Sequence, residues 1–222
     1  MKVEKLISNN QPSDWLDKVT RECQAYPIDM VDMDADELLI DVGSNVGGFL
    51  NAWPYRFNRV WVVEPSKYNF EQFYKNIDAK KYAEFRYSRN AVGKKSGEVL
   101  KLQKYWAGEN DTVSGNFGTQ QFVSDNGHGW QGEYEEVIAL SFEDVIKGAD
   151  VGLLKIDCEG AEYDFLMGKD LSKVKWIVGE FHNFLGGVKQ MELFTHIKQT
   201  HEQIYSEGDG NTSHFVKLFK RK

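Results

Sequence analysis

The sequence predicts an α/β fold built on a doubly wound, mostly parallel β-sheet with an antiparallel edge. Short apolar runs that resemble buried strands alternate along the chain with segments whose apolar residues recur at helical spacing. This alternation is typical of a parallel sheet covered by helices. The last two strand-like runs are joined by a glycine-rich turn, which indicates an antiparallel pair. The 222 residues suit one such domain.

The composition excludes several classes of protein. Hydrophobic residues make up 41% of the chain, enough for a packed core, and the formal net charge is -7. We expect no binding to nucleic acid or to an anionic membrane surface, because affinity for phosphate depends on clustered Lys and Arg. The two cysteines, Cys23 and Cys158, cannot build a disulfide framework. No apolar run is long enough to span a membrane. We therefore expect a cytoplasmic protein.

The first half of the chain predicts an N-terminal extension and the start of the main domain. Residues 1–36 form the extension, with a helix over 13–25 that begins at Ser13, and residues 37–222 form the domain. "ELLIDVGSNVGGFL" predicts a strand over 38–42, a glycine-rich turn and a helix from about Val46 that Pro54 ends. "RVWVVEPS" predicts the next strand, after which Ser66 caps a helix.

The second half predicts the remaining strands and a long insertion. A third strand lies within "AEFRYSRNAVG", and residues 97–104 form the first arm of an antiparallel excursion. Residues 105–134 show no periodicity and are predicted as an insertion loop. The next expected elements are a strand and short helix in "EEVIALSFEDVI", strands in "VGLLKID" and "KWIVGEFH", a helix over 187–199, and two closing strands within "EQIYSEGDGNTSHFVKLF".

Polar side chains stand where the predicted strands end. They are Asp41, Glu64, Asn90, Asp157, Glu180 and His182. Ligands of open α/β sheets bind beyond the carboxyl ends of the strands. We therefore expect a binding site at this edge of the sheet.

The glycine-rich loop "DVGSNVGGF" (residues 41–49) indicates the kind of ligand. It lacks the G-x-G-x-x-G pattern of dinucleotide folds, because Asn45 stands where the second glycine is needed. Asp41 would repel a diphosphate but favour a cation, and Glu64 could accept hydrogen bonds from both ribose hydroxyls. S-adenosyl-L-methionine combines a ribose with a positively charged sulfonium. The alternative is that Asp41 and Glu64 only cap nearby turns.

These motifs resemble one family of proteins. "DVGSNVGGF", "VVEPS", "NAVG" and above all "LLKIDCEGAEYDFL" are similar to the FkbM-type methyltransferases, which are Rossmann-like and depend on S-adenosylmethionine. The resemblance covers roughly residues 38–182. It implies O-methyl transfer to a hydroxyl of a sugar, glycan or natural-product small molecule. It also implies a set of cofactor-binding residues: Asp41, Gly43, Ser44, Asn45 and Gly47 at the methionine end, Glu64 and Pro65 at the ribose, Asn90, Ala91 and Val92 near the adenine, and Asp157 near the methyl group.

The catalytic candidates are Asp157, Glu180 and His182. Methyl transfer to a hydroxyl needs a positioned oxygen and a group that accepts its proton. Glu180 and His182 are two residues apart at the end of a predicted strand and share a face, and His182 is the natural base near neutral pH. Two carboxylates and an imidazole could instead bind a divalent metal, which we do not favour, and a purely structural role for His182 stays open. Lys155 is expected to pair with Asp157 or Glu159.

Two other functions are possible for such a chain. The fold could serve as a non-catalytic binding or scaffold protein, although Asp41, Gly43, Glu64 and Asp157 are all present. It could also serve an NAD-dependent oxidoreductase, against which the missing glycine pattern counts.

Overall fold

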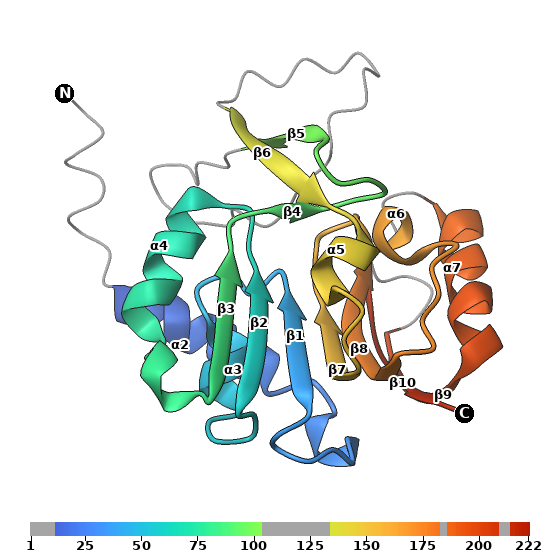
Figure 1. The fold of residues 1–222 in the computed structure, drawn as a ribbon, viewed down its shortest axis with the longest axis horizontal. Coiled ribbons are helices and arrows are strands. Elements are labelled where there is room, and N and C mark those ends of the chain that lie inside the picture. Colours follow the sequence, from blue (N-terminus) through green and yellow to red (C-terminus); the bar gives the residue numbers. More distant parts are fainter. Residues whose placement is uncertain (1–11, 104–133, 183–185, 209–213) are drawn as a thin grey trace.

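The computed structural model describes residues 12–103, 134–182, 186–208 and 214–222, and it contains a seven-stranded main sheet (Figure 1). Strands β3, β2, β1, β7 and β8 are parallel, whereas β10 runs antiparallel to both of its neighbours. The predicted fold class and its antiparallel edge are therefore confirmed. In spatial order the sheet consists of β3 (Glu84–Ser88), β2 (Arg59–Val63), β1 (Leu38–Val42), β7 (Val151–Ile156), β8 (Val174–His182), β10 (His214–Arg221) and β9 (His201–Glu207).

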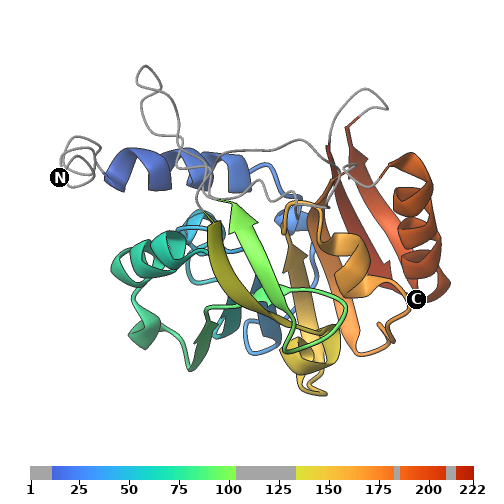
Figure 2. The same cartoon turned by 90° about the horizontal axis from the view of Figure 1, so that it is seen from above.

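Helices cover both faces of the main sheet. One face packs against α2 (Pro12–Cys23), α3 (Gly48–Ala52) and α4 (Lys67–Asn76). The other packs against α5 (Phe142–Ile146), α6 (Glu162–Leu166) and α7 (Gly187–Thr200). Two short 3-10 helices, Ile28–Met30 and Ala79–Lys81, lie in connections. Figure 2 shows α2 lying lengthwise along its side of the molecule. The sheet is thus buried on both faces, as parallel sheets require.

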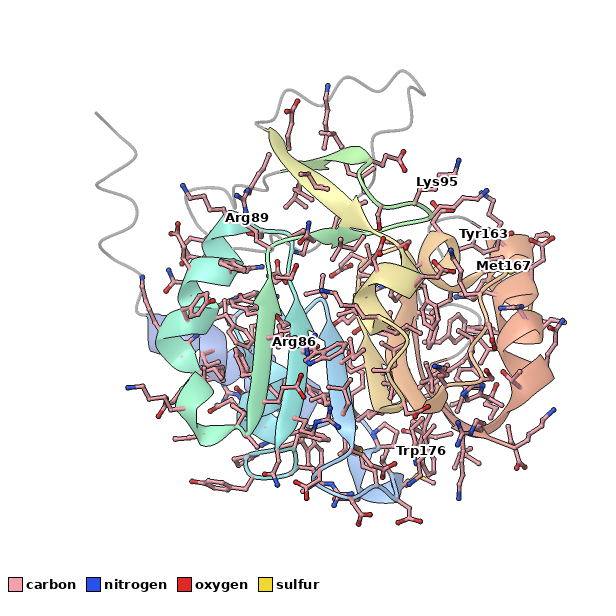
Figure 3. All side chains as sticks on the ribbon, in the orientation of Figure 1. Arg86, Arg89, Lys95, Tyr163, Met167 and Trp176 are labelled. Carbon is pink, nitrogen blue, oxygen red and sulfur yellow. The ribbon has the colours of Figure 1, made fainter. Side chains whose placement is uncertain are left out.

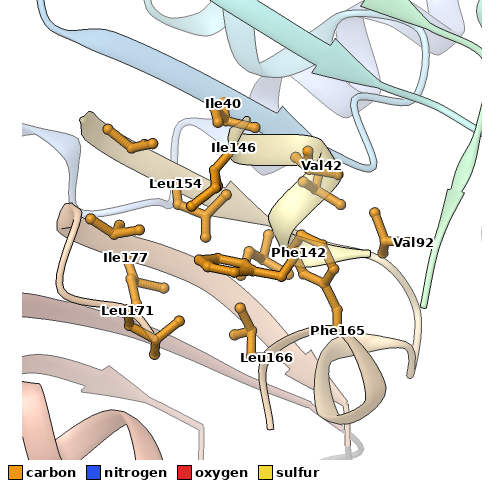
Figure 4. Close-up of a cluster of buried hydrophobic side chains, with 14 of the residues drawn as sticks. Ile40, Val42, Val92, Phe142, Ile146, Leu154, Phe165, Leu166, Leu171 and Ile177 are labelled. Carbon is orange, nitrogen blue, oxygen red and sulfur yellow. The ribbon is translucent and has the colours of Figure 1, made fainter. Parts of the chain in front are cut away.

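The alternation of side chains along the strands decides which residues meet which helices. Ile40 of β1, Leu154 of β7 and Ile177 of β8 point to one face, where they meet Phe142 and Phe165 of α5 and α6 (Figure 4). Each such fully buried side chain contributes about 1.5–3 kcal/mol. The residues between them therefore face α2 and α3, and Asp41 is one of these.

A second, three-stranded sheet lies beyond the carboxyl ends of β1, β2 and β3 (Figure 1). It is formed by β4 (Ala91–Val92), β6 (Tyr134–Leu140) and β5 (Val99–Gln103), and β5 pairs antiparallel with β6. The predicted antiparallel excursion is confirmed. Of the predicted insertion loop, residues 105–133 lie outside the described residues, and Tyr134 already belongs to β6.

The starts of two helices differ from the predictions. Helix α2 begins at Pro12, one residue before Ser13, and proline is well suited to a first helical position. Helix α3 begins at Gly48 rather than Val46, because Asn45 and Gly47 adopt left-handed backbone angles, with φ of 52° and 97°. The predicted end of α3 before Pro54 and the Ser66 cap are confirmed, since α3 ends at Ala52 and Ser66 Oγ accepts a hydrogen bond from the Asn69 amide.

The described part of the N-terminal extension packs into the core of the main domain. Trp15 and Val19 of α2 are buried in the same cluster as Leu39 of β1. Further along, Trp176 at the amino end of β8 (Figure 3) donates a hydrogen bond to the Asp32 carbonyl at 3.0 Å. Residues 12–36 therefore form a wall of the main domain and do not stand apart from it.

Candidate active site

A buried ion pair lies beneath the glycine-rich loop. Asp41 and Lys155 are register partners on β1 and β7, and Lys155 Nζ lies 3.1 Å from Asp41 Oδ1. The same ammonium donates a hydrogen bond to the Gly43 carbonyl at 2.7 Å and lies 3.8 Å from Asp157 Oδ2. Burial raises the pKa of Asp41, and the charge of Lys155 opposes that effect. Asp41 is compensated inside the protein, so direct contact of Asp41 with a cofactor stays a prediction.

Gly43 allows the ends of β1 and β7 to approach each other. Its φ is 73°, and a Cβ atom there would lie 1.7 Å from the carbonyl oxygen of Asp157. Its amide donates to the Val63 carbonyl at 2.9 Å. No other residue fits this position without moving β7, which explains the glycine at the start of the loop.

Glu64 is buried at the end of β2 and is held by backbone amides. Its Oε2 accepts from the Asn45 amide and its Oε1 from the Ser66 amide, both at 2.9 Å, while Asn69 Nδ2 donates to Oε1 at 3.4 Å. Burial raises the pKa of Glu64 to about 7, although these hydrogen bonds lower it. Oε1 already accepts two donors and Oε2 one, so one lone pair of Oε2 is left for a further donor. A ribose hydroxyl is a suitable donor, so Glu64 fits the predicted role toward one hydroxyl, and contact with both stays a prediction.

Most of the predicted cofactor residues line one cavity. It lies between the glycine-rich loop, the ends of β2 and β7, and β4. The predicted residues in its lining are Gly43, Asn45, Glu64, Pro65, Asn90, Ala91, Val92 and Asp157. The structure therefore brings these residues together, and their contact with a cofactor stays a prediction.

Three predicted cofactor residues do not line this cavity. Asp41 lies below the loop, and Ser44 lines a second cavity. Gly47 packs against the end of α4, where a Cβ atom would lie 2.7 Å from Ile77 Cγ1. These residues shape the loop from behind in this structure.

The second cavity, of about 820 Å³, adjoins the first. Four residues line both cavities: Gly43, Asn45, Asp157 and Glu159. The rest of its lining comes from α2 and the segment after it, from Ser44, Lys155 and Glu180, and from the β9–β10 end of the sheet. We call the first the cofactor cavity, after the predicted cofactor residues in its lining, and the second the acceptor cavity, after the acceptor that the predicted reaction requires.

His182 lies between carboxylates. Its Nδ1 is 3.0 Å from Glu162 Oε1, and its Nε2 is 3.1 Å from Glu159 Oε2 and 3.6 Å from Glu180 Oε1. Burial lowers the pKa of His182, but the hydrogen bonds to Glu159 and Glu162 outweigh burial and raise the pKa to about 11. The predicted proximity of His182 and Glu180 is confirmed. An imidazole that is protonated at neutral pH cannot accept a proton, so these contacts favour a structural role over that of a base.

Carboxylates gather at the junction of the two cavities. Burial and the nearby charge of Asp157 raise the pKa of Glu180 to about 7. Burial also raises the pKa of Glu159, against the effect of its hydrogen bond to His182. Tyr26 Oη donates to Asp157 Oδ2 at 3.3 Å and orients that side chain. A carboxyl group that titrates near pH 7 is well suited to accept a proton at physiological pH.

The alternative of a divalent metal falls on the same residues. Ligand atoms of Asp157, Glu159 and His182 lie within 4.8 Å of one another. A metal there would have to displace the proton through which His182 Nε2 contacts Glu159. The metal alternative stays a prediction that we do not favour.

Sequence reasoning missed several residues of the site. Tyr26 lies in the N-terminal extension and reaches Asp157 across 131 positions of sequence. Glu162 at the start of α6 is buried and pairs with His182. The expected pairing of Lys155 with Asp157 is confirmed at 3.8 Å, but sequence reasoning missed the closer pairing of Lys155 with Asp41 at 3.1 Å. The only sequence signal for that pair is that each stands near the end of its strand.

Solved structures share this fold. The fibrillarin/Nop5p complex matches with a TM-score of 0.51 and 8% identity, over 91% of this chain and 79% of that chain. TrmK of M. capricolum, in complex with S-adenosylhomocysteine, matches with a TM-score of 0.47 and 7% identity, over 93% of this chain and 67% of that chain. The ribosomal protein L11 methylase of Lactobacillus delbrueckii subsp. bulgaricus matches with a TM-score of 0.45 and 9% identity, over 94% of this chain and 79% of that chain. No curated protein matches the sequence.

The family profile for the methyltransferase FkbM domain matches residues 41–206, about three quarters of the chain. This match, on the fold described above, defines a methyltransferase that depends on S-adenosyl-L-methionine. The chain therefore belongs to the FkbM methyltransferase family. Among the described helices, none is both long and apolar enough to cross a membrane.

Proposed function

We propose that the protein transfers the methyl group of S-adenosyl-L-methionine to a hydroxyl of a sugar, glycan or natural-product small molecule. The supporting observation is the junction of the cofactor and acceptor cavities, where Asp157, Glu159 and Glu180 gather. A hydroxyl is a weak nucleophile and needs a group that takes its proton. A positioned general base contributes roughly 10²–10⁴-fold to such a step.

The charges in the acceptor cavity support an acceptor without phosphate groups. Carboxylates outnumber ammonium groups in its lining, and Lys155 already pairs with Asp41. The acidic residues of the lining are Glu22, Asp157, Glu159, Glu180 and Glu207, and the basic ones are Lys18 and Lys155. A nucleic-acid backbone would be repelled there. Neutral hydroxyl compounds avoid this repulsion and can donate hydrogen bonds to the carboxylates.

Different residues of this chain have different roles in the proposed reaction. The bound cofactor supplies a methyl group on an electron-poor sulfonium. Glu64 accepts hydrogen bonds from the ribose, and Asn90 to Val92 border the adenine. Glu180 takes the proton of the acceptor hydroxyl, while Tyr26 fixes Asp157 beside it. Holding the two reactants in line contributes several further powers of ten to the rate.

Calorimetric titration of S-adenosylhomocysteine into the protein tests the cofactor, with NAD as the control and with EDTA present and absent. We expect one-to-one micromolar binding of S-adenosylhomocysteine and none of NAD. Transfer of an isotope-labelled methyl group to a panel of sugars and other hydroxyl compounds then tests the acceptor. Binding without transfer to any acceptor would support the scaffold alternative, and absence of binding would overturn the proposal.

The variant Glu64→Gln tests the ribose contact. It retains the size of the side chain but loses the charge that receives the hydroxyl hydrogen bonds. Hydrogen bonds to a charged group contribute about 1.5–3 kcal/mol, so affinity for S-adenosylhomocysteine should fall roughly 10–100-fold in calorimetry. Glu71→Gln on exposed α4 is the matched control and should bind normally. Equal affinity of the two variants would remove Glu64 from the ribose site.

A further inference from the structure

The network around the cavity junction holds more negative than positive groups. Within the described residues it contains five carboxyl groups and two cations. Lys155 lies 3.1 Å from Asp41 and 3.8 Å from Asp157, and His182 lies 3.0 Å from Glu162 and 3.1 Å from Glu159. The carboxyl groups are Asp41, Asp157, Glu159, Glu162 and Glu180, and the cations are Lys155 and His182. Both cations are thus shared among several carboxylates.

Titratable groups face Glu180 from every side of the junction. Its neighbour on β10 is Val216, which carries no charge. The groups that act on it are Lys155 from β7, Asp157 and Glu159 from the segment after β7, His182 from β8, and Tyr26 from the segment after α2. Glu22, Cys23 and Glu207 line the same cavity, and Glu162 reaches the junction through His182. Carboxyl groups outnumber the cations in this set. Crowded carboxylates in a partly buried site retain a proton near neutral pH, because a second or third negative charge is costly there.

A ligand that brings a positive charge to this junction would change that balance. Asp157 and Glu159 line both cavities, so they border any group that is transferred between them. Substrate and product forms of the cofactor differ in this respect. S-adenosylmethionine carries a sulfonium, whereas S-adenosylhomocysteine carries an uncharged thioether.

We propose that the positive charge of S-adenosylmethionine, bound beside the carboxylate-rich junction, expels the proton of Glu180, so that Glu180 is ready as a base only while the methyl donor is bound. This inference rests on the proposed function. It adds that the protonation of Glu180 depends on whether S-adenosylmethionine or S-adenosylhomocysteine is bound. Burial and the charge of Asp157, which raise the pKa of Glu180 to about 7, agree with this geometry.

The chemical step balances within this arrangement. The O–H bond of the acceptor and the S–CH3 bond break, and an O–CH3 bond forms. The electron pair of the S–CH3 bond stays on sulfur, which becomes an uncharged thioether. Glu180 accepts the proton. Once the sulfonium charge is gone, the carboxylate cluster again favours its protonated form, so the proton stays on the protein until the next methyl donor binds.

Calorimetry in two buffers of different ionisation enthalpy counts the protons released when each ligand binds. At pH 7 a group with a pKa of about 7 is half protonated, so S-adenosylmethionine should release roughly half a proton more than S-adenosylhomocysteine. The affinity for S-adenosylmethionine should also rise roughly tenfold from pH 6 to pH 8 relative to that for S-adenosylhomocysteine. Glu64 also titrates near pH 7 but faces the ribose that both ligands share, so its effect cancels.

The variant Glu180→Gln should bind S-adenosylhomocysteine normally, which shows that it is folded, and should lose the difference in proton release. Glu202→Gln, at an exposed position of β9, is the matched control and should retain the difference. Equal proton release by the two ligands in the unmodified protein, or an unchanged difference in Glu180→Gln, would overturn the inference. Binding of neither ligand would overturn the proposed function itself.

Discussion

At the scale of single residues, His182 contributes to stability, because it places a positive charge beside the buried carboxylate of Glu162. The variant His182→Ala leaves that buried carboxylate without the imidazolium 3.0 Å away. Removing one partner of a buried ion pair costs about 3–5 kcal/mol. We therefore expect a loss of that order in the free energy of unfolding, measured by urea denaturation.

Two further variants make this test specific. His182→Ala combined with Glu162→Ala should recover part of the loss, because the uncompensated carboxylate is then absent. His196→Ala is the matched control, since His196 bonds the Lys169 carbonyl on the far side of α6 and should cost much less. If His182→Ala were as stable as His196→Ala, the imidazole would not serve as the counter-charge.

At the scale of elements, the contact between α2 and α3 depends on Gly48. A Cβ atom at Gly48 would lie 2.5 Å from Val19 Cγ1 and 2.9 Å from the Val19 carbonyl carbon. The variant Gly48→Ala should therefore push α2 outward, at a cost of about 1–3 kcal/mol for overpacking. Limited proteolysis should cleave the segment before β1 faster, and thermal unfolding should begin at a lower temperature.

The matched control is Gly187→Ala. Both glycines are the first residue of a helix, but nothing lies within 4 Å of a Cβ atom at Gly187. Alanine there should be neutral, or stabilising by up to about 1 kcal/mol. Equal stability of the two variants would mean that α2 does not depend on close contact with α3.

The elements also show how far sequence reasoning extends. The strand ends were predictable, because each apolar run stops at a polar residue, and these residues do meet at one edge. The local sequence pattern does not predict the pairing of Asp41 with Lys155, because that pairing depends on the register between β1 and β7. The local pattern does not predict the contact of Tyr26 with Asp157 either. That contact depends on where α2 lies, and α2 is placed by long-range packing against α3.

At the scale of the whole molecule, the raised pKa values predict how stability depends on pH. Glu64 and Glu180 have pKa values raised from 4.5 to about 7, and His182 from 6.5 to about 11. The folded protein therefore binds more protons than the unfolded chain across these ranges. The stabilisation is complete below the unfolded pKa values and is lost as pH rises, from 4.5 to 7 for the carboxyl groups and from 6.5 to 11 for His182.

We expect the melting temperature of the ligand-free protein to fall by several degrees between pH 5 and pH 8. Each kcal/mol corresponds to about 2–4 °C for a chain of this size. Differential scanning fluorimetry across that range measures the change, and Glu64→Gln should flatten it. A melting temperature that rises with pH would contradict the assignment of these groups.

The place of β10 between β8 and β9 has a consequence for how the protein is made. The lining of the cofactor cavity extends only from Val42 to Ala161, whereas the acceptor cavity needs Val216 of β10. On the ribosome these two points are separated by several seconds of synthesis, at roughly 5–20 residues per second. During that time β9 has been made but lacks β10, its only partner among the described strands. The unpaired β9 and the open edge of β8 are then the parts of the nascent chain that most need a chaperone.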